Sequence, residues 1–318
     1  MDEHFHYCDR LNAAIDARRT AAVVGIDPVL ERLPAELRPA EPTAQAAATA
    51  LEAFGRLVID TVAPIVPAVK INSGFFEAFY EFGVAAYFRL IEHAHARGLL
   101  VIGDIKRGDI GSTARFYARG HLAEPTARDV NAARIPDAVT LAGYLGIHAI
   151  EPFVEAARAS GRGVYVLVRP SDPGADEVHE FGEAARFYQH MAGLVRGWGD
   201  DDGLTGRCGL SCVGAVVAPK DAASTAALRA NLPRTPLLVP GYGAQGAGAE
   251  SCRSCFLSNG RGAVVNASRS VIYAYEPAGK TDAPRPEWTE CIATACRRFA
   301  ADIAPLAGFP PTPAPAGT

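Results

Sequence analysis

Short runs of β-branched and other apolar residues alternate with longer stretches of helical spacing along most of this chain. Near-continuous apolar runs are typical of strands in a parallel sheet that is covered on both faces. Eight such runs occur, at Val23–Ile26, Val66–Ile71, Leu99–Asp104, Ala138–Leu141, Val164–Val168, Val213–Val217, Pro236–Val239 and Ala263–Val265. Eight strand–helix units favour a closed TIM (β/α)8 barrel over an open sheet.

The segments between these runs are mostly long enough for crossover helices. Helical apolar spacing marks three of them, at Leu51–Ile59, Ala85–Ala96 and Phe181–Val195. Ahead of the first run, Phe5–Arg19 predicts an amphipathic helix that caps the bottom of the barrel. The Pro-rich end predicts a disordered tail at 307–318. We therefore expect a single barrel over residues 1–306.

Composition narrows the function classes. The 318 residues are 49% hydrophobic and 21% charged, with a formal net charge of −4, which argues against a general nucleic-acid binder. Apolar runs stay shorter than a membrane span, so we expect no membrane partner. The polar, acidic N-terminus lacks the layout of a secretory signal, and we expect a cytoplasmic protein.

The seven cysteines leave one alternative open. An odd count in a chain expected to stay in the cytosol favours reduced thiols. Cys252 and Cys255 form a CxxC pair and Cys208 and Cys212 a CxxxC pair, so the four together could make a four-thiolate zinc site. Since nothing else in the sequence supports a metal, we favour thiols without a partner and expect no metal.

Polar residues gather where the predicted strands end, and active sites of this fold form at the carboxyl ends of its strands. They are Asp27, Lys70, Asn72, Asp104, Lys106, Asp109, Ser171 and Arg269. Asp104 and Lys106 lie two apart on one strand and so point to the same face, with Lys70 on the neighbouring strand. The alternative is a salt-bridged barrel rim, but barrel interiors are usually filled by branched apolar side chains.

The last two strand ends predict a phosphate site. Gly241, Gly243 and Gly246 would let backbone N–H groups approach an anion closely, and Arg269 could donate two parallel hydrogen bonds to it. Barrel enzymes often bind phosphate after their seventh and eighth strands.

At this point the sequence resembles the orotidine 5′-monophosphate decarboxylase family, and most of all its longer bacterial branch. The segment Asp104-Ile105-Lys106-Arg107-Gly108-Asp109 resembles the family's D-x-K-x-x-D signature. The resemblance covers about Val23 to Tyr275. The other matching segments are Val24–Pro28, Val69-Lys70 with Phe75–Glu77, Pro240–Gly246 and Val265–Arg269.

The resemblance implies decarboxylation of orotidine 5′-monophosphate to UMP without a cofactor or metal. It makes Lys70, Asp104, Lys106 and Asp109 a catalytic array, in which Lys106 stabilises a carbanion at C6 and donates the proton. It also implies a homodimer with shared active sites, in which Asp109 and Thr113 cross the interface. The other implied substrate-binding residues are Asp27 at the ribose, Ser171 at the pyrimidine, Gly243, Gln245 and Arg269 at the phosphate, and Asn72.

The chain departs from the pattern of the longer bacterial branch at three strand ends. Ala142-Gly143 stand where Asn-Pro is expected, and Pro170 precedes Ser171 where threonine is expected. Ala218-Pro219-Lys220 after the sixth strand is also unusual. None of these changes removes a proposed catalytic group, so any effect would fall on rate or loop conformation.

Two other functions fit part of this sequence pattern. A Mg²⁺-dependent sugar-phosphate decarboxylase or aldolase of the same superfamily shares the D-x-K-x-x-D pattern, but typically has an acidic residue where Lys70 stands. An ammonium there would repel a divalent cation. A non-catalytic nucleotide-binding barrel is the second alternative, because a fold alone does not prove activity.

Overall fold

The computed structural model describes residues 6–41, 43–242 and 248–310, and its strands close into one parallel barrel in the order β1 to β8. The strands are β1 (Ala22–Ile26), β2 (Ala68–Asn72), β3 (Leu100–Arg107), β4 (Ala138–Leu141), β5 (Gly163–Arg169), β6 (Val213–Val217), β7 (Leu237–Val239) and β8 (Ala263–Ala267). Every expected strand is present within a few residues, and the predicted TIM barrel is confirmed. Apolar side chains on both faces of the strands explain the match, since these strands are buried almost throughout.

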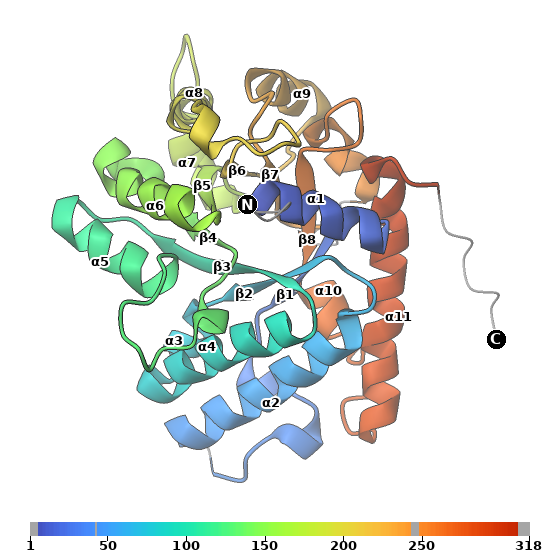
Figure 1. The fold of residues 1–318 in the computed structure, drawn as a ribbon. Coiled ribbons are helices and arrows are strands. Elements are labelled where there is room, and N and C mark those ends of the chain that lie inside the picture. Colours follow the sequence, from blue (N-terminus) through green and yellow to red (C-terminus); the bar gives the residue numbers. More distant parts are fainter. Residues whose placement is uncertain (1–5, 42, 243–247, 311–318) are drawn as a thin grey trace.

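Helices form an outer ring around the strands (Figure 1). The longer ones are α2 (Ala44–Val62), α4 (Tyr80–Ala96), α5 (Gly111–His121), α6 (Ile147–Ser160), α8 (Phe187–Trp198), α9 (Ala222–Asn231) and α11 (Arg285–Ile303). Short helices α3 (Gly74–Glu77), α7 (Asp176–His179) and α10 (Arg269–Ile272) follow strand ends, and a 3-10 helix, η8 (Ala249–Cys255), lies between β7 and β8. Within the described ranges, no helix has the length and apolar character needed to cross a membrane.

One helix begins later than its apolar spacing indicates. The expected helix Phe181–Val195 starts instead at Phe187, and Phe181 is 78% exposed. Gly182 has a φ of +117°, which breaks the helical path, and a capping interaction between Arg186 and Gln189 fixes the new start.

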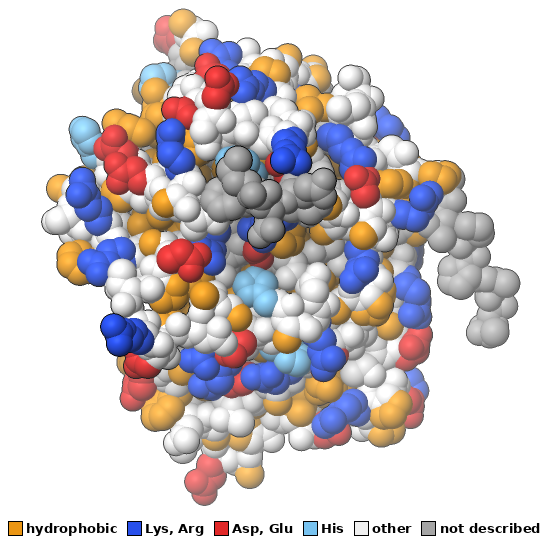
Figure 2. All heavy atoms as spheres, viewed as in Figure 1, with side chains coloured by type: hydrophobic (Ala, Val, Ile, Leu, Met, Phe, Trp, Pro, Cys, Tyr) orange, Lys and Arg blue, Asp and Glu red, His pale blue; other side chains and the backbone are white. Residues whose placement is uncertain are grey.

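The N-terminal helix α1 (Tyr7–Arg18) lies across the amino ends of the strands, in front of the barrel in Figure 1. The Tyr7 ring packs against Gly163 at the start of β5, where a Cβ would lie 2.4 Å from it. The Tyr7 hydroxyl also lies 3.2 Å from that of Tyr165. On the face seen in Figure 2, which includes α1, basic and acidic side chains are interspersed.

A buried carboxylate ties α1 to the barrel. Asp137, only 6% exposed, pairs with Arg10 of α1 and accepts hydrogen bonds from the backbone N–H of Val101 at 2.8 Å and from His95 Nε2 at 2.9 Å. Burial opposes the charged form of His95, but Asp137 outweighs burial and raises the pKa of the imidazole. The same cluster holds the pKa of Asp137 below its ordinary value despite burial.

At the other end of the chain, residues 307–310 belong to the packed part of the structure. Ala307 is 2% exposed at the end of the 3-10 helix Ala304–Ala307, and the Phe309 ring lies against the guanidinium groups of Arg19 and Arg261. The packing of the chain therefore continues beyond the position where the sequence placed the start of a tail. Residues 311–318 lie outside the described ranges.

Replacing Asp137 by asparagine should destabilise the protein, and more at about pH 6 than at about pH 9. A raised His95 pKa contributes stability that is complete below the unfolded value of about 6.5 and is lost as pH rises through the folded pKa. We expect the free energy of unfolding to fall by about 3 kcal/mol at the lower pH, which is typical of a broken buried ion pair. Urea unfolding of wild type and Asp137→Asn at both pH values measures this difference. In a His95→Gln background the loss should become independent of pH, and a pH-dependent loss there would contradict the assignment.

Candidate active site

Three charged side chains meet where β2 and β3 run side by side. Asp104 accepts a hydrogen bond from Lys70 Nζ at 2.7 Å through Oδ2 and another from Lys106 Nζ at 2.6 Å through Oδ1. Lys70 Nζ also lies 3.6 Å from Asp27 Oδ1, at the end of β1. The structure thus brings together four residues that the sequence proposed for one pocket, in an alternating chain of carboxylates and ammonium groups.

Burial and mutual attraction fix the charges of this array. The Lys70 side chain is 8% exposed and that of Asp104 is 7% exposed, whereas Lys106 is 47% exposed. Burial favours the neutral form of Asp104, but the two ammonium groups outweigh it and hold the pKa of Asp104 well below its usual range. Burial also disfavours a charged Lys70, but Asp27 and Asp104 raise its pKa. Lys70 and Asp104 therefore stay ionised at neutral pH.

Lys106 has an unusual backbone that aims its side chain. Its φ is +46°, in the left-handed region that few residues other than glycine adopt, and the register between β3 and β4 shifts between Gly103 and Arg107. Such irregularities in strands redirect side chains and are common beside active sites. The Lys106 N–H donates to Thr140 Oγ1 at 3.1 Å, which stabilises this conformation.

Thr140 is a site residue that the sequence reasoning missed. Its hydroxyl, 1% exposed on β4, donates to Asp104 Oδ1 at 2.8 Å. The signal was present, since Thr140 is the one polar residue in the four-residue run Ala138–Leu141. Threonine is also common in strands as a β-branched packing residue. The sequence pattern alone therefore did not distinguish a packing role for Thr140 from a hydrogen-bonding role in the site.

A cavity of about 620 Å³ adjoins the array at the ends of β1, β7 and β8. Asp27, Ser171 and Arg269 all line it, together with Gly241 and Asn266. Two of its polar atoms, Asp27 Oδ1 and Asn266 Oδ1, are buried and have no hydrogen-bond partner among the described residues. Buried acceptors without partners are costly, so the cavity is suited to a ligand that carries hydroxyl or N–H groups.

The side chains of the remaining predicted residues have other neighbours. Asn72 uses its side-chain oxygen to accept a hydrogen bond from the N–H of Gly74 at 3.1 Å and lines a separate cavity of about 310 Å³ with Pro28 and Phe75. Asp109 is partly exposed and accepts a hydrogen bond from the N–H of Ile110 at 2.7 Å, and Thr113 is exposed on α5. Neither contacts the array within the chain. Gly243 and Gln245 lie outside the described residues.

The residues Ala142-Gly143, which replace the Asn-Pro expected in the longer bacterial branch of the family, lie in tightly packed backbone. A Cβ on Gly143 would lie 2.8 Å from Val166 Cγ1, and one on Gly108 would lie 2.6 Å from the Ala142 carbonyl oxygen. The loop that carries Asp109 therefore rests directly on the end of β4.

Next to Pro170, the guanidinium of Arg169 is buried and holds the neighbouring loops. It donates to Glu180 Oε1 at 2.8 and 3.0 Å and to Ser224 Oγ at 2.9 Å. Arg169 thereby fixes the strand end that precedes Ser171.

Comparisons with known proteins now bear on this geometry. Residues 45–283 match the model of the orotidine 5′-phosphate decarboxylase / HUMPS family. The chain belongs to this family. It is 39% identical over 279 residues to orotidine 5′-phosphate decarboxylase of Rhodopirellula baltica, covering 85% of this chain and 89% of the relative. Orotidine 5′-phosphate decarboxylase of Clostridium tetani is 36% identical over 225 residues, which cover 70% of this chain and 74% of the relative.

Solved structures agree with this family membership. OMP decarboxylase of Leishmania donovani superposes with a TM-score of 0.71 at 25% identity, covering 96% of this chain and all of the other. A Streptomyces avermitilis structure, described as a candidate orotidine 5′-phosphate decarboxylase, superposes with a TM-score of 0.73 at 32% identity. The superposition covers 95% of this chain and 96% of the other. The resemblance seen in the sequence motifs is thereby confirmed.

Replacing Lys70 by methionine should raise the pKa of Asp104 toward the ordinary carboxyl range. The substitution removes an ammonium group but leaves the carboxylate buried, and both changes favour the neutral acid. The carboxyl carbon signal of Asp104, followed by NMR as pH is lowered, reports it. Thr140→Val removes a neutral donor to the same carboxylate and should raise the pKa less. An Asp104 signal that titrates identically in wild type and Lys70→Met would show that the electrostatic coupling is absent.

Proposed function

We propose that this chain decarboxylates orotidine 5′-monophosphate to UMP, a step of pyrimidine synthesis, and that the Lys70–Asp104–Lys106 array performs the chemistry. The relatives named above share this activity by name, and the family model covers most of the chain. The observation that carries the proposal is the buried Asp104 carboxylate held between two ammonium groups beside a polar cavity.

Loss of CO₂ from C6 of the pyrimidine leaves an electron pair that the ring delocalises poorly. A fixed ammonium beside C6 stabilises that charge as it develops and then supplies the proton. Lys106 suits this role because it is the exposed member of the array, and Asp104 and Thr140 hold it in place. Asp104 faces the departing carboxylate, and Lys70 keeps Asp104 charged.

The polar cavity supports a binding mode for the nucleotide. Asp27 offers the ribose hydroxyls a carboxylate oxygen that has no hydrogen-bond partner among the described residues, Ser171 offers a hydroxyl to the pyrimidine, and Arg269 a guanidinium to the phosphate. Contacts of Asn72, Gly243 and Gln245 with the nucleotide remain predictions from the sequence. Phosphate binding lies away from the bond that breaks, so its energy can be used to position the base.

We also infer a homodimer whose subunits share their active sites. Asp109 and Thr113 lie on the β3–α5 segment and point to no partner within the array of their own chain. Large apolar side chains on this segment and on the neighbouring β4–α6 segment are exposed: Ile110, Phe116, Tyr144, Leu145 and Ile147. Exposed apolar groups of this size favour a protein–protein contact that would carry Asp109 into the site of the other subunit.

The Mg²⁺-dependent alternative is disfavoured by the position of Lys70. Its Nζ lies within 3.6 Å of both Asp27 and Asp104, so an ammonium occupies the space between the two carboxylates that a divalent cation would need.

The purified protein should convert orotidine 5′-monophosphate at the same rate with and without EDTA, as measured by the loss of substrate absorbance. Failure to turn over this substrate while binding UMP would favour a non-catalytic barrel.

Lys106→Ala should lower kcat/KM for orotidine 5′-monophosphate by about a thousandfold or more, because it removes the group that meets the developing charge. Steady-state kinetics measure the loss, with circular dichroism to verify the fold. Lys280→Ala removes a surface lysine that pairs with Glu287 and serves as the matched control with unchanged kinetics. Near wild-type activity in Lys106→Ala would exclude the proposed role.

Mixing inactive Lys106→Ala and Asp109→Ala proteins should restore activity if the sites are shared. Half of randomly mixed dimers are hybrids, and each hybrid has one intact site, so roughly a quarter of wild-type activity should return. Subunit exchange under mild denaturant followed by the absorbance assay measures it. No recovery, despite exchange shown by mass spectrometry, would argue against a shared site.

Arg269→Ala should weaken UMP binding by about 10- to 100-fold, since a charge-assisted hydrogen bond contributes about 1.5–3 kcal/mol. Calorimetric titration with UMP measures the change. Uridine lacks the phosphate, so its affinity should be the same in both proteins. Arg297→Ala, on the outer helix α11, is the matched control. Equal weakening for UMP and uridine would place Arg269 away from the phosphate.

A further inference from the structure

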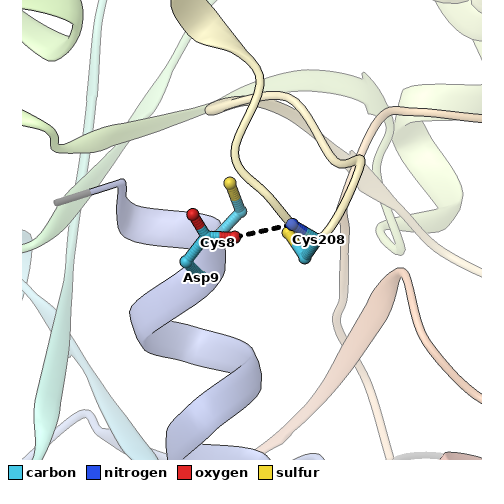
Figure 3. Close-up of side chains that lie close together, drawn as sticks. All are labelled: Cys8, Asp9 and Cys208. Carbon is cyan, nitrogen blue, oxygen red and sulfur yellow. Dashed lines mark hydrogen bonds between the residues drawn. The ribbon is translucent and has the colours of Figure 1, made fainter. Parts of the chain in front are cut away.

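A second cluster of reactive side chains lies at the amino end of the barrel, where α1 meets the hairpin that precedes β6. Cys8 Sγ, a carboxylate oxygen of Asp9 and Cys208 Sγ lie within 4.8 Å of one another (Figure 3). The Cys8 thiol also interacts with Cys212, whose Sγ lies 3.5 Å from His6 Nδ1. Three thiols, an imidazole and a carboxylate therefore converge from two segments that are about 200 residues apart.

The hairpin is shaped so that both of its cysteines face α1. Thr205 and Ser211 pair as an antiparallel bridge, and the N–H of Gly206 donates to the Leu210 carbonyl at 3.0 Å. Asp9 clamps the tip of the hairpin, because its two carboxylate oxygens accept the backbone N–H groups of Arg207 at 3.0 Å and Cys208 at 2.8 Å. The backbone around Cys208 is thereby held in place before any ligand arrives.

Gly206 permits the close approach. A Cβ at this position would lie 2.6 Å from both Cys8 Sγ and Asp9 Oδ1. The absence of a side chain lets the hairpin reach α1, and the thiols meet as a consequence. Cys8 and Cys212 are 1% exposed, whereas Cys208 is exposed and leaves a path from solvent.

We propose that this cluster is a structural zinc site, with Cys8, Cys208, Cys212 and His6 as ligands and Asp9 holding the hairpin in position. Thiolates with one imidazole are a common ligand set for zinc in closed structural sites. Tetrahedral zinc with bonds of about 2.3 Å to sulfur separates its sulfur ligands by about 3.8 Å. Cys8 Sγ and Cys208 Sγ lie within 4.8 Å of each other, and Cys212 Sγ lies 3.5 Å from His6 Nδ1, so zinc binding would draw these two pairs of donors together.

This site is independent of the decarboxylase chemistry. It lies at the amino ends of the strands, whereas the Lys70–Asp104–Lys106 array lies toward their carboxyl ends. A metal here would link α1 to the segment before β6 and stabilise the fold. Removing it should lower the melting temperature without a direct effect on the active site.

The site departs from the expectation of no metal, and it differs from the four-thiolate arrangement considered from the sequence. Cys252 and Cys255 are buried in η8, and among the described residues the donors that all lie within 4.8 Å of one another are Cys8, Asp9 and Cys208. Cys208 and Cys212 instead lie next to Cys8, which is far from them in sequence and is brought close by the fold.

Metal content and thermal stability test the proposal. Protein purified with reductant should retain about one zinc ion per chain after exposure to ZnCl₂ and gel filtration, as measured by mass spectrometry of the metal. Co²⁺ in place of zinc should give thiolate-to-cobalt charge-transfer absorption. Cys208→Ser changes an exposed residue at the hairpin tip, and it should lower retained zinc at least tenfold and remove the zinc-dependent rise in melting temperature.

Cys291→Ser, a partly exposed cysteine on α11, is the matched control and should retain zinc like the wild type. Two results would overturn the proposal. One is a wild-type protein that retains no more zinc than Cys208→Ser. The other is a cobalt-loaded wild-type protein that shows no thiolate-to-cobalt charge-transfer absorption.

Discussion

The chemistry proposed for this enzyme depends on keeping one buried carboxylate ionised. Asp104 is almost fully removed from water, a position that would ordinarily favour its neutral form, yet two ammonium groups bond its two oxygens at 2.6 and 2.7 Å. The two buried charges depend on their neighbours: Asp27 and Asp104 support Lys70, and Lys70 and Lys106 support Asp104. Asp104 in turn orients Lys106. A fixed, dry arrangement of this kind can act on a developing charge without reorganising.

The barrel supplies that fixed arrangement through ordinary packing. The β2–β3 register sets Asp104 opposite Asn72, two residues beyond Lys70, so Lys70 and Asp104 share a face, and the shift in the β3–β4 register accompanies the left-handed backbone of Lys106. Thr140 on the next strand bonds both Asp104 and the backbone of Lys106, so strain at Lys106 is offset by strand β4. The half-exposed end of Lys106 is then the part of the array free to meet a substrate.

Much of this could be predicted from the sequence because the signals were local. Apolar runs located all eight strands, and the spacing of Asp104 and Lys106 placed both on one face. Features that depend on three-dimensional closure were not predictable: the bond from Thr140 and the meeting of Cys8 with Cys208 join segments remote in sequence. The late start of α8 was missed because its apolar spacing continues through Gly182, where the backbone turns.

The central claim is that a fixed ammonium makes a C6 carbanion accessible, and proton exchange on the product tests it most directly. If Lys106 donates the proton to C6, the reverse step must also be catalysed, so wild-type enzyme should exchange the C6 hydrogen of UMP for deuterium in D₂O. NMR of the UMP pool measures this without any decarboxylation. The account predicts exchange in wild type and none above background in Lys106→Ala. Equal exchange by the two proteins would contradict it.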